Sequence, residues 1–491
     1  MTAGPARGLL LVACGLAHSA GAAEPSDWPQ SRRDAQNSAA TVIEAEASGA
    51  PRAWAFDGSG RTWGYEPGMT VWTSPAVGRV AGRAVLVAGS YDHDVYCLDA
   101  ASGELLYKVT TGGRVQSTPT LWSDGERSWL YVASNDRLLY GLDAANGRQL
   151  WVHAVEDYRP TLGGARLSSP VVGSAGDRPA VFVGHWVWDR SLAAGFQRGR
   201  LSAFDAREGK PLWVSELGDN EITAPIFARV KGRGVLFAGS ASGAFFAIDA
   251  SEGRVLWQHT ELDAIKSAPA LVELSGATLV VLGSKYGALR ALDAVTGAER
   301  WSFKTGDRIM GSPLVISTSG RARIAVGSYD GGLYLVEAET GRRAWRYSAR
   351  AGIYSSPAIA LEGPRALILV SAWDHALHAV GADDGSLSFA PFTGRPLWAV
   401  SGLDASTWAS PVAARINGHW MAFVGSYDGT LRALPLDDAG REAPALRSNS
   451  LFWLSFPLVL APVILLAVAL TRRDRRRRVL DGGAPSTRAQ R

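Results

Sequence analysis

Short apolar runs alternate with Gly and Asp-Gly turns over most of this chain, and no helical periodicity lasts beyond about ten residues in that region. One unit shows the pattern clearly. Its first apolar run follows Pro269, the second ends at Gly-Ser before Lys285, the third ends at Leu-Asp-Ala around Asp293, and the fourth carries Trp301. Runs of this length and punctuation predict four antiparallel strands joined by hairpins.

The unit recurs eight times along the chain. Its leading proline is preceded each time by small residues, and the prolines are Pro75, Pro119, Pro170, Pro225, Pro269, Pro313, Pro357 and Pro411. The spacings are 44, 51, 55, 44, 44, 44 and 54 residues. Four strands in each of eight units at this period predict an all-β fold, an eight-bladed β-propeller.

The two ends of the repeat region complement each other. The eighth unit stops at residues 431–434, without a fourth strand that carries an aromatic residue, and such a strand stands alone at residues 52–56. We therefore expect the N-terminal strand to complete the last blade and to cover its open edge. Each blade then has one fourth-strand aromatic residue: Trp54, Tyr107, Trp151, Trp213, Trp257, Trp301, Trp345 and Trp398.

The turn Leu-Asp-Ala-x-x-Gly and the Trp that follows it resemble the repeats of the pyrroloquinoline-quinone (PQQ)-like propeller superfamily. The lead-in that begins Asp27-Trp28-Pro29 is also similar to that of many bacterial members. The resemblance covers about residues 27–440. It implies the fold but not one function, because the superfamily contains both quinoprotein dehydrogenases and non-catalytic scaffolds of the BamB type.

Both ends of the chain contain targeting features. Residues 1–23 have the form of a signal peptide, although Leu11-Val12-Ala13-Cys14 also fits a lipoprotein box that would place a lipid on Cys14. Residues 451–470 are twenty residues without a charge, long enough to cross a bilayer, and an arginine cluster follows at once. The positive-inside rule then predicts a single-pass inner-membrane protein, with its propeller in the bacterial periplasm.

These features divide the chain into six parts. They are a signal peptide (1–23), a lead-in (24–50), the propeller (51–440), a linker (441–450), a transmembrane helix (451–470) and a basic cytoplasmic tail (471–491).

The positive net charge comes from the tail. Residues 471–491 carry +6 and Arg7 carries +1, so the total of +4 leaves −3 for the rest of the chain. A nearly neutral propeller does not indicate nucleic-acid binding. Cys97 is the only cysteine besides Cys14, so we expect a buried apolar residue in the first blade; the alternative is a reactive thiol.

The sequence argues against an enzyme. For the dehydrogenases, the resemblance implies PQQ stacked between a tryptophan and a disulfide of adjacent cysteines, beside calcium, and this chain has no adjacent cysteine pair. The histidines are scattered apart from His375 and His378. Asp330 and Asp428, in Tyr-Asp-Gly, suggest hairpin turns more than a ring of carboxylates. We therefore predict no catalytic, cofactor-binding or metal-binding residues; PQQ with calcium belongs only to the dehydrogenase alternative.

A binding surface is predicted where the repeats differ. In a propeller, the residue three before each proline and the residue after each Gly-Ser lie on the same face. Both positions become aromatic in blades 7, 8 and 1, which contribute Trp72, Tyr91, Tyr354, Trp373, Trp408 and Tyr427. Aromatic side chains dominate interface hot spots. The alternative is that these rings only pack between blades.

Two insertions, at about residues 186–198 in blade 3 and 385–393 in blade 7, are expected to lengthen loops near the ring.

The function predicted from these observations is a membrane-anchored periplasmic scaffold that binds a protein or peptide. The alternatives are a PQQ-dependent dehydrogenase with an atypical site and a periplasmic sensor of a small ligand or glycan.

Overall fold

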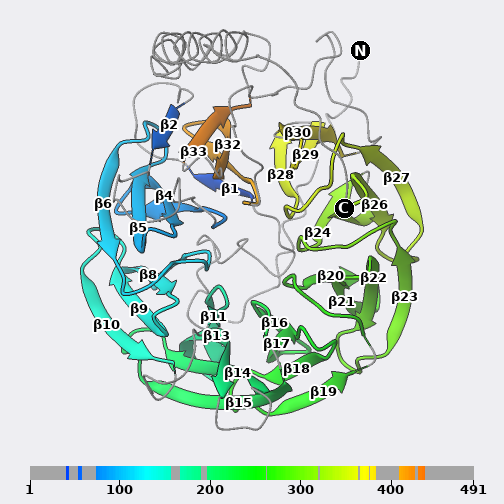
Figure 1. The fold of residues 1–491 in the computed structure, drawn as a ribbon, viewed down its shortest axis with the longest axis horizontal. Coiled ribbons are helices and arrows are strands. Elements are labelled where there is room, and N and C mark those ends of the chain that lie inside the picture. Colours follow the sequence, from blue (N-terminus) through cyan, green and yellow to red (C-terminus); the bar gives the residue numbers. More distant parts are fainter. Residues whose placement is uncertain are drawn as a thin grey trace, which may run out of the picture. The chain divides into compact units, whose positions relative to one another are not determined.

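The structure is a computed structural model that describes residues 40–43, 54–57, 73–155, 166–189, 196–219, 221–260, 262–318, 321–362, 365–374, 376–382, 409–425 and 430–436. The described strands form eight sheets arranged as a ring around a central axis (Figure 1). The predicted eight-bladed all-β propeller is therefore confirmed.

Within a blade, successive strands of the repeat pair antiparallel, and the first of them lies nearest the axis (Figure 1). Blade 1 contains β3 (Ala76–Val80), β4 (Arg83–Gly89), β5 (Asp94–Asp99) and β6 (Leu105–Thr110), and blade 2 contains β7 (Thr120–Ser123), β8 (Ser128–Ala133), β9 (Leu138–Asp143) and β10 (Gln149–Ala154). Blade 3 contains β11 (Arg166–Leu167), β12 (Val171–Ala175), β13 (Arg178–Asp189), β14 (Phe196–Asp205) and β15 (Pro211–Asp219). Blade 4 contains β16 (Ile226–Val230), β17 (Arg233–Gly239), β18 (Phe245–Asp249) and β19 (Val255–His259).

Blades 5 to 8 continue the order around the ring. Blade 5 contains β20 (Ala270–Leu274), β21 (Ala277–Gly283), β22 (Ala288–Asp293) and β23 (Glu299–Lys304), and blade 6 contains β24 (Leu314–Thr318), β25 (Arg321–Gly327), β26 (Gly332–Glu337) and β27 (Arg343–Ser348). In blade 7 the described strands are β28 (Ala358–Glu362), β29 (Arg365–Ala372) and β30 (Ala376–Gly381). Blade 8 contains β31 (Val412–Ile416), β32 (His419–Gly425) and β33 (Thr430–Pro435), together with β2 (Trp54–Asp57) and β1 (Ala40–Ile43). The fourth strand expected in blade 7, with Trp398, lies outside the described residues.

The last blade is closed as the sequence predicted, and it also has a strand that the sequence did not predict. β2 pairs antiparallel with β33, with Trp54 opposite Ala433. β1 pairs parallel with β31 on the axis side of the blade, with Ala40 opposite Ala413. The N-terminal segment therefore supplies both the outermost and the innermost strand of blade 8, which leaves neither β31 nor β33 as an open edge.

Six of the fourth-strand aromatic residues, those whose side chains the structure describes, join their blade to the next one. The indole nitrogen of Trp301 donates to the carbonyl of Ala338, at 2.8 Å. Trp213, Trp257 and Trp345 donate in the same way to the equivalent alanine carbonyl of the next blade, at 3.0–3.2 Å. The Trp301 ring lies against Gly341, whose φ is +70° and whose Cβ, if it had one, would lie 2.7 Å from the ring. The turn that begins Leu-Asp-Ala therefore ends in glycine because a tryptophan from the preceding blade covers it.

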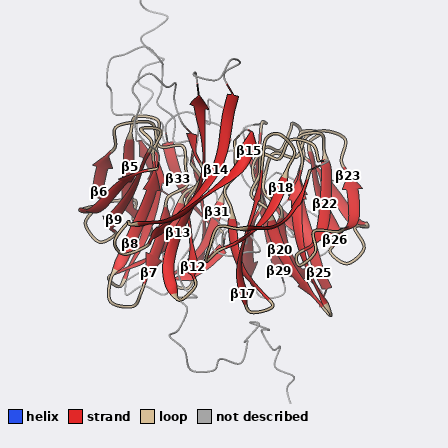
Figure 2. Ribbon diagram, turned by 90° about the horizontal axis from the view of Figure 1, so that it is seen from below, coloured by secondary structure: helices blue, strands red, loops and turns tan. Residues whose placement is uncertain are grey.

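The insertion in blade 3 differs from the expected loop. β13 runs to Asp189 and β14 begins at Phe196, and these two residues pair. The extra residues thus continue the antiparallel ladder, and the strands rise beyond the other blades on one side of the ring (Figure 2). The corresponding insertion in blade 7 lies outside the described residues.

The expected signal peptide, linker, transmembrane helix and cytoplasmic tail also lie outside the described residues. Within the part of the chain that the structure describes, no helix has the length and apolar character needed to cross a membrane.

Candidate binding site in the central channel

A cavity of about 330 Å³ lies where the segments that precede the repeated prolines meet. The residue three before each proline was predicted to lie at this mouth. The structure describes six of these eight residues, and all six line the cavity: Gln116, Leu167, Ile222, Lys266, Met310 and Tyr354. Every described residue three before a repeated proline therefore lines one cavity.

The small residues before each proline have two separate tasks. In blades 1 and 7 the residue two before the proline holds its own blade: Thr73 Oγ1 accepts from the amide of Gly89 at 2.9 Å, and Ser355 Oγ accepts from that of Ser371 at 2.8 Å. Ser117 donates to the carbonyl of Ala133 at 2.7 Å, across the same interval of sixteen residues. These bonds join the start of the first strand to the end of the second.

The residue directly before the proline links adjacent blades. Its amide donates to the side-chain hydroxyl of the same position in the next blade. Such bonds join Thr118 to Ser169, Ala268 to Ser312, Ser312 to Ser356, Ser356 to Ser410, and Ser410 to Ser74, at 2.7–3.2 Å. The last of these closes the ring between blade 8 and blade 1. The repeated Ser/Thr-Ser-Pro pattern thus has a structural cause, and it lines the channel with polar atoms.

Three partly buried aromatic rings from blades 6 and 7 form a cluster, and one of them, Tyr354, lines the cavity. Tyr354 stacks on Trp373, with centroids 6.5 Å apart and planes at 10°, and Tyr329 meets both rings edge-on at 5.6 and 5.1 Å. The Arg308 guanidinium lies 5.9 Å from the Tyr329 ring. Burial raises the pKa of Tyr329 to about 12, so its hydroxyl is neutral at physiological pH.

The predicted surface residues are only partly brought together. Tyr354 and Trp373 lie in the aromatic cluster, whereas Tyr91 lies in blade 1 under the guanidinium of Arg114, and its hydroxyl accepts a hydrogen bond from Gln116. Trp72, Trp408 and Tyr427 lie outside the described residues. Tyr329 was not predicted, although its position after Gly-Ser is equivalent to that of Trp373.

The neighbouring sector of the cavity, in blades 4 and 5, is charged. Lys266 Nζ lies 2.6 Å from Glu221 Oε2, and each side chain is 32% exposed. The cavity therefore has an aromatic side, formed by blades 6 and 7, and a side in blades 4 and 5 that carries an ion pair.

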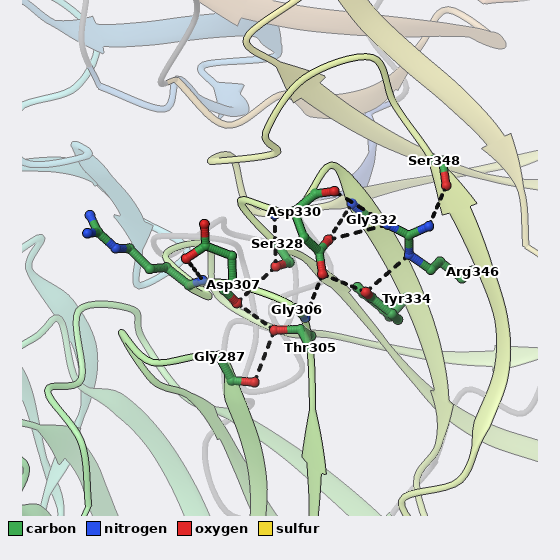
Figure 3. Close-up of polar contacts among 11 residues, drawn as sticks. Gly287, Thr305, Gly306, Asp307, Ser328, Asp330, Gly332, Tyr334, Arg346 and Ser348 are labelled. Atoms are coloured by element: carbon green, nitrogen blue, oxygen red, sulfur yellow. Dashed lines mark hydrogen bonds and ion pairs between the residues drawn. The ribbon is translucent and has the colours of Figure 1, made fainter.

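The Asp330 carboxylate has a structural role in a turn, as the sequence predicted. Its carboxylate accepts hydrogen bonds from the amides of Gly332 and Gly306 at 2.7 and 2.6 Å and from the Tyr334 hydroxyl at 2.6 Å (Figure 3). Burial alone would raise the pKa of Asp330, but these bonds, together with the charge of Arg346, hold it below its ordinary value. Asp330 therefore fastens the loop between blades 5 and 6. The equivalent Asp428 lies outside the described residues.

A related network in blade 7 was missed by the sequence reasoning. Nε2 of the buried His378 lies 3.0 Å from Asp374 Oδ1, and its Nδ1 lies 2.9 Å from the Tyr347 hydroxyl. The spacing in the sequence could have predicted this network, because His378 follows Asp374 by four residues, as Tyr334 follows Asp330. His378 thus replaces the tyrosine of the repeat.

The described side chains do not match the cofactor site that the dehydrogenase resemblance implies. Among them, no group of three His, Cys, Asp or Glu residues is placed to hold a metal ion. Cys97 is fully buried in β5, as predicted, and burial raises the pKa of its thiol to about 11.

Comparison with solved structures supports the propeller fold. Sqt1 from Saccharomyces cerevisiae has a TM-score of 0.59 at 12% identity, covering 79% of this chain and 99% of its own. The designed protein Ika8 has a TM-score of 0.53 at 15% identity, covering 76% and 98%. BamB from Moraxella catarrhalis has a TM-score of 0.44 at 20% identity, covering 71% and 95%. At these identities the likeness to Sqt1 and Ika8 concerns the fold alone.

The sequence comparisons identify the family. No curated protein matches the chain significantly. The family model for the outer membrane protein assembly factor BamB matches residues 52–272, 197–321, 253–389 and 285–440, which together span the whole repeat region. The propeller and its repeat agree with this match, and the chain belongs to the BamB family of PQQ-like propellers.

Proposed function

We propose that this protein is a binding scaffold for a protein or peptide partner, which it contacts at the mouth of the central channel. The observation that carries the proposal is the cluster of Tyr329, Tyr354 and Trp373. Its rings pack against one another, so they are already ordered, each is partly exposed, and Tyr354 lines the cavity. Rigid aromatic rings of this kind provide contact area at a small entropic cost.

Family membership supports a scaffold role, because the matching family is described as an outer membrane assembly factor. We further propose that residues 451–470 anchor the chain in the inner membrane and place the propeller in the periplasm. The support is the uncharged stretch followed by the arginine cluster. Labelling single cysteines introduced at Ser128 and at Ser486 with a membrane-impermeant reagent tests this: only the first is expected to react in intact spheroplasts.

The partner surface is tested by replacing Tyr354 and Trp373 with alanine in the full-length chain. A photocrosslinking amino acid placed at Tyr329 is expected to give discrete adducts in cells, and the double substitution is expected to weaken partner binding at least tenfold, as at interface hot spots. The matched control is Tyr286→Ala, which removes a tyrosine that is 62% exposed on blade 5.

Two results would contradict the proposal. One is equal loss of binding in the Tyr286 control and in the double variant. The other is dye-linked oxidation of alcohols or sugars after the addition of PQQ and calcium, which would indicate a dehydrogenase.

A further inference from the structure

The ring of hydrogen bonds between blades is interrupted from blade 3 to blade 5. Its repeated geometry aims each amide at the side chain that precedes the next proline, but Ala224 and Ala268 occupy that position in blades 4 and 5. A methyl group cannot accept a hydrogen bond. The amides of Ser169 and Ala224 consequently have no acceptor among the described residues, and both residues line the cavity.

The ring is also open between Ser74 and Thr118, but there Thr118 supplies a hydroxyl that can rotate to accept. At Ala224 and Ala268 no described side chain provides a hydroxyl that could rotate to accept a hydrogen bond from the open amides.

A buried hydroxyl in the same sector also lacks a partner. Ser267 occupies the position where Thr73 and Ser355 bind the end of their own second strand, yet its Oγ is buried without any hydrogen bond to a described residue. Ser267 is 4% exposed and lines the cavity. Its neighbour Lys266 adds an ammonium group, of which Glu221 engages one proton.

A buried donor without a partner costs stability, and the Ser267 hydroxyl is such a donor. Ser169 and Ala224 are only partly buried, so their open amides are available to an acceptor from outside the protein. The amides of Ser169 and Ala224, the hydroxyl of Ser267 and the ammonium of Lys266 all belong to the lining of one cavity. Donors of this kind bind a carboxylate best, because charge-assisted hydrogen bonds are the stronger ones.

We propose that this sector is a carboxylate seat that binds the C-terminal carboxylate of an extended peptide. The inference rests on the proposed function and names the part of the partner that enters the channel. Backbone amides arranged around a pocket are a recurring means of capturing a peptide C-terminus. A cavity of about 330 Å³ is small for a folded segment, and Leu167 and Ile222 provide apolar surface beside the donors for the terminal side chains.

The negative charge of Glu221 offsets only part of what attracts a carboxylate to this seat. That carboxylate forms an ion pair with Lys266, so it offsets the lysine charge and leaves the two amides and the Ser267 hydroxyl as donors. We therefore expect selectivity for an ionised carboxylate over the isosteric amide, and not a general attraction for anions.

Three probes test the seat on the purified full-length chain, by ligand-observed NMR and calorimetry. They are acetyl-Ala-Ala-Ala with a free carboxylate, the same tripeptide as its C-terminal amide, and acetate. We expect the acid to bind saturably and at least tenfold more tightly than the amide. The double variant Ala224→Ser with Ala268→Ser should weaken the acid at least tenfold, because two protein hydroxyls would then accept from the amides, and its unfolding midpoint should not fall.

Ser410→Ala is the matched control. It removes an acceptor from the ring between blades 7 and 8, three blades from the blade of Lys266, and should leave binding of the acid within twofold of the original chain. Equal binding of acid and amide, an unaffected double serine variant, or no binding of any probe would overturn the proposal; the last result would mean that the seat holds ordered water only. Acetate binding as tightly as the tripeptide would overturn the assignment to peptides.

The same variants separate this inference from the proposed function. Partner binding that is unchanged in the double serine variant, but lost when Tyr354 and Trp373 become alanine, would refute the seat and leave the scaffold role standing. The absence of any partner for the original chain would refute the scaffold role, whatever the tripeptides do.

Discussion

The indole hydrogen bond of Trp301 provides a measurable estimate of the cohesion between blades. Trp301→Phe removes the donor that lies 2.8 Å from the carbonyl of Ala338, a residue with no exposed surface. A buried acceptor left without its donor costs about 1–3 kcal/mol. The missing ring atoms leave a void that costs roughly a further 1–2 kcal/mol. We therefore expect the free energy of unfolding to fall by about 2–5 kcal/mol.

Trp129→Phe is the matched control, because it makes the same chemical change at another buried tryptophan. Trp129 is 4% exposed and Trp301 is 9% exposed, but Nε1 of Trp129 has no hydrogen-bond partner among the described residues. This substitution loses ring atoms and no hydrogen bond, so it should cost at most about 2 kcal/mol.

Guanidinium unfolding followed by far-UV circular dichroism measures both variants. The expected excess cost at Trp301 is about 1–3 kcal/mol, with an unchanged denaturant slope. Equal midpoints for the two variants would show that the indole bond contributes nothing, and blade cohesion would then have to come from apolar packing alone.

Three further results are expected. Hydrogen bonds outweigh burial and lower the pKa of Asp330 and Asp374 below 3.8. The stability that these two carboxylates contribute is therefore present above that pH and is lost as pH falls through the folded-state pKa. Asp330→Asn should reduce the acid dependence of the unfolding midpoint, and an unchanged dependence would contradict this. Cys97, with its pKa near 11, should react with a thiol reagent only upon unfolding, as the labelling rate in native buffer and in denaturant will show. Deleting residues 24–57 while keeping residues 1–23 exposes the edges of β31 and β33 and should promote aggregation, measurable by light scattering.

The repeat predicted most of the fold because each element of it has a local cause. Proline and the small residues before it mark the first strand, and Leu-Asp-Ala marks the turn after the third. Trp54 identified the closing strand, since one aromatic residue was missing from the count. β1 could not be found in this way, because its four residues carry no repeat signal and it is held by pairing with a strand about 370 residues away.

The candidate site was predictable only as a set of positions. The six described residues three before a proline line the cavity because the repeat geometry places them there. Their interactions depend on the neighbouring blade, which the sequence pattern does not show. Tyr354 stacks on Trp373 within its own blade and meets Tyr329 of the preceding one, whereas Tyr91 lies elsewhere on the ring.

The sequence by itself determined the architecture of this protein: eight units of antiparallel strands and a last blade completed by an N-terminal strand. These follow from turn residues and apolar periodicity, which act over a few residues. Only the tertiary structure decided what the variable positions do. A serine and an alanine before proline are nearly equivalent for the strand that follows, but across the blade interface one accepts a hydrogen bond and the other leaves an amide open to the channel.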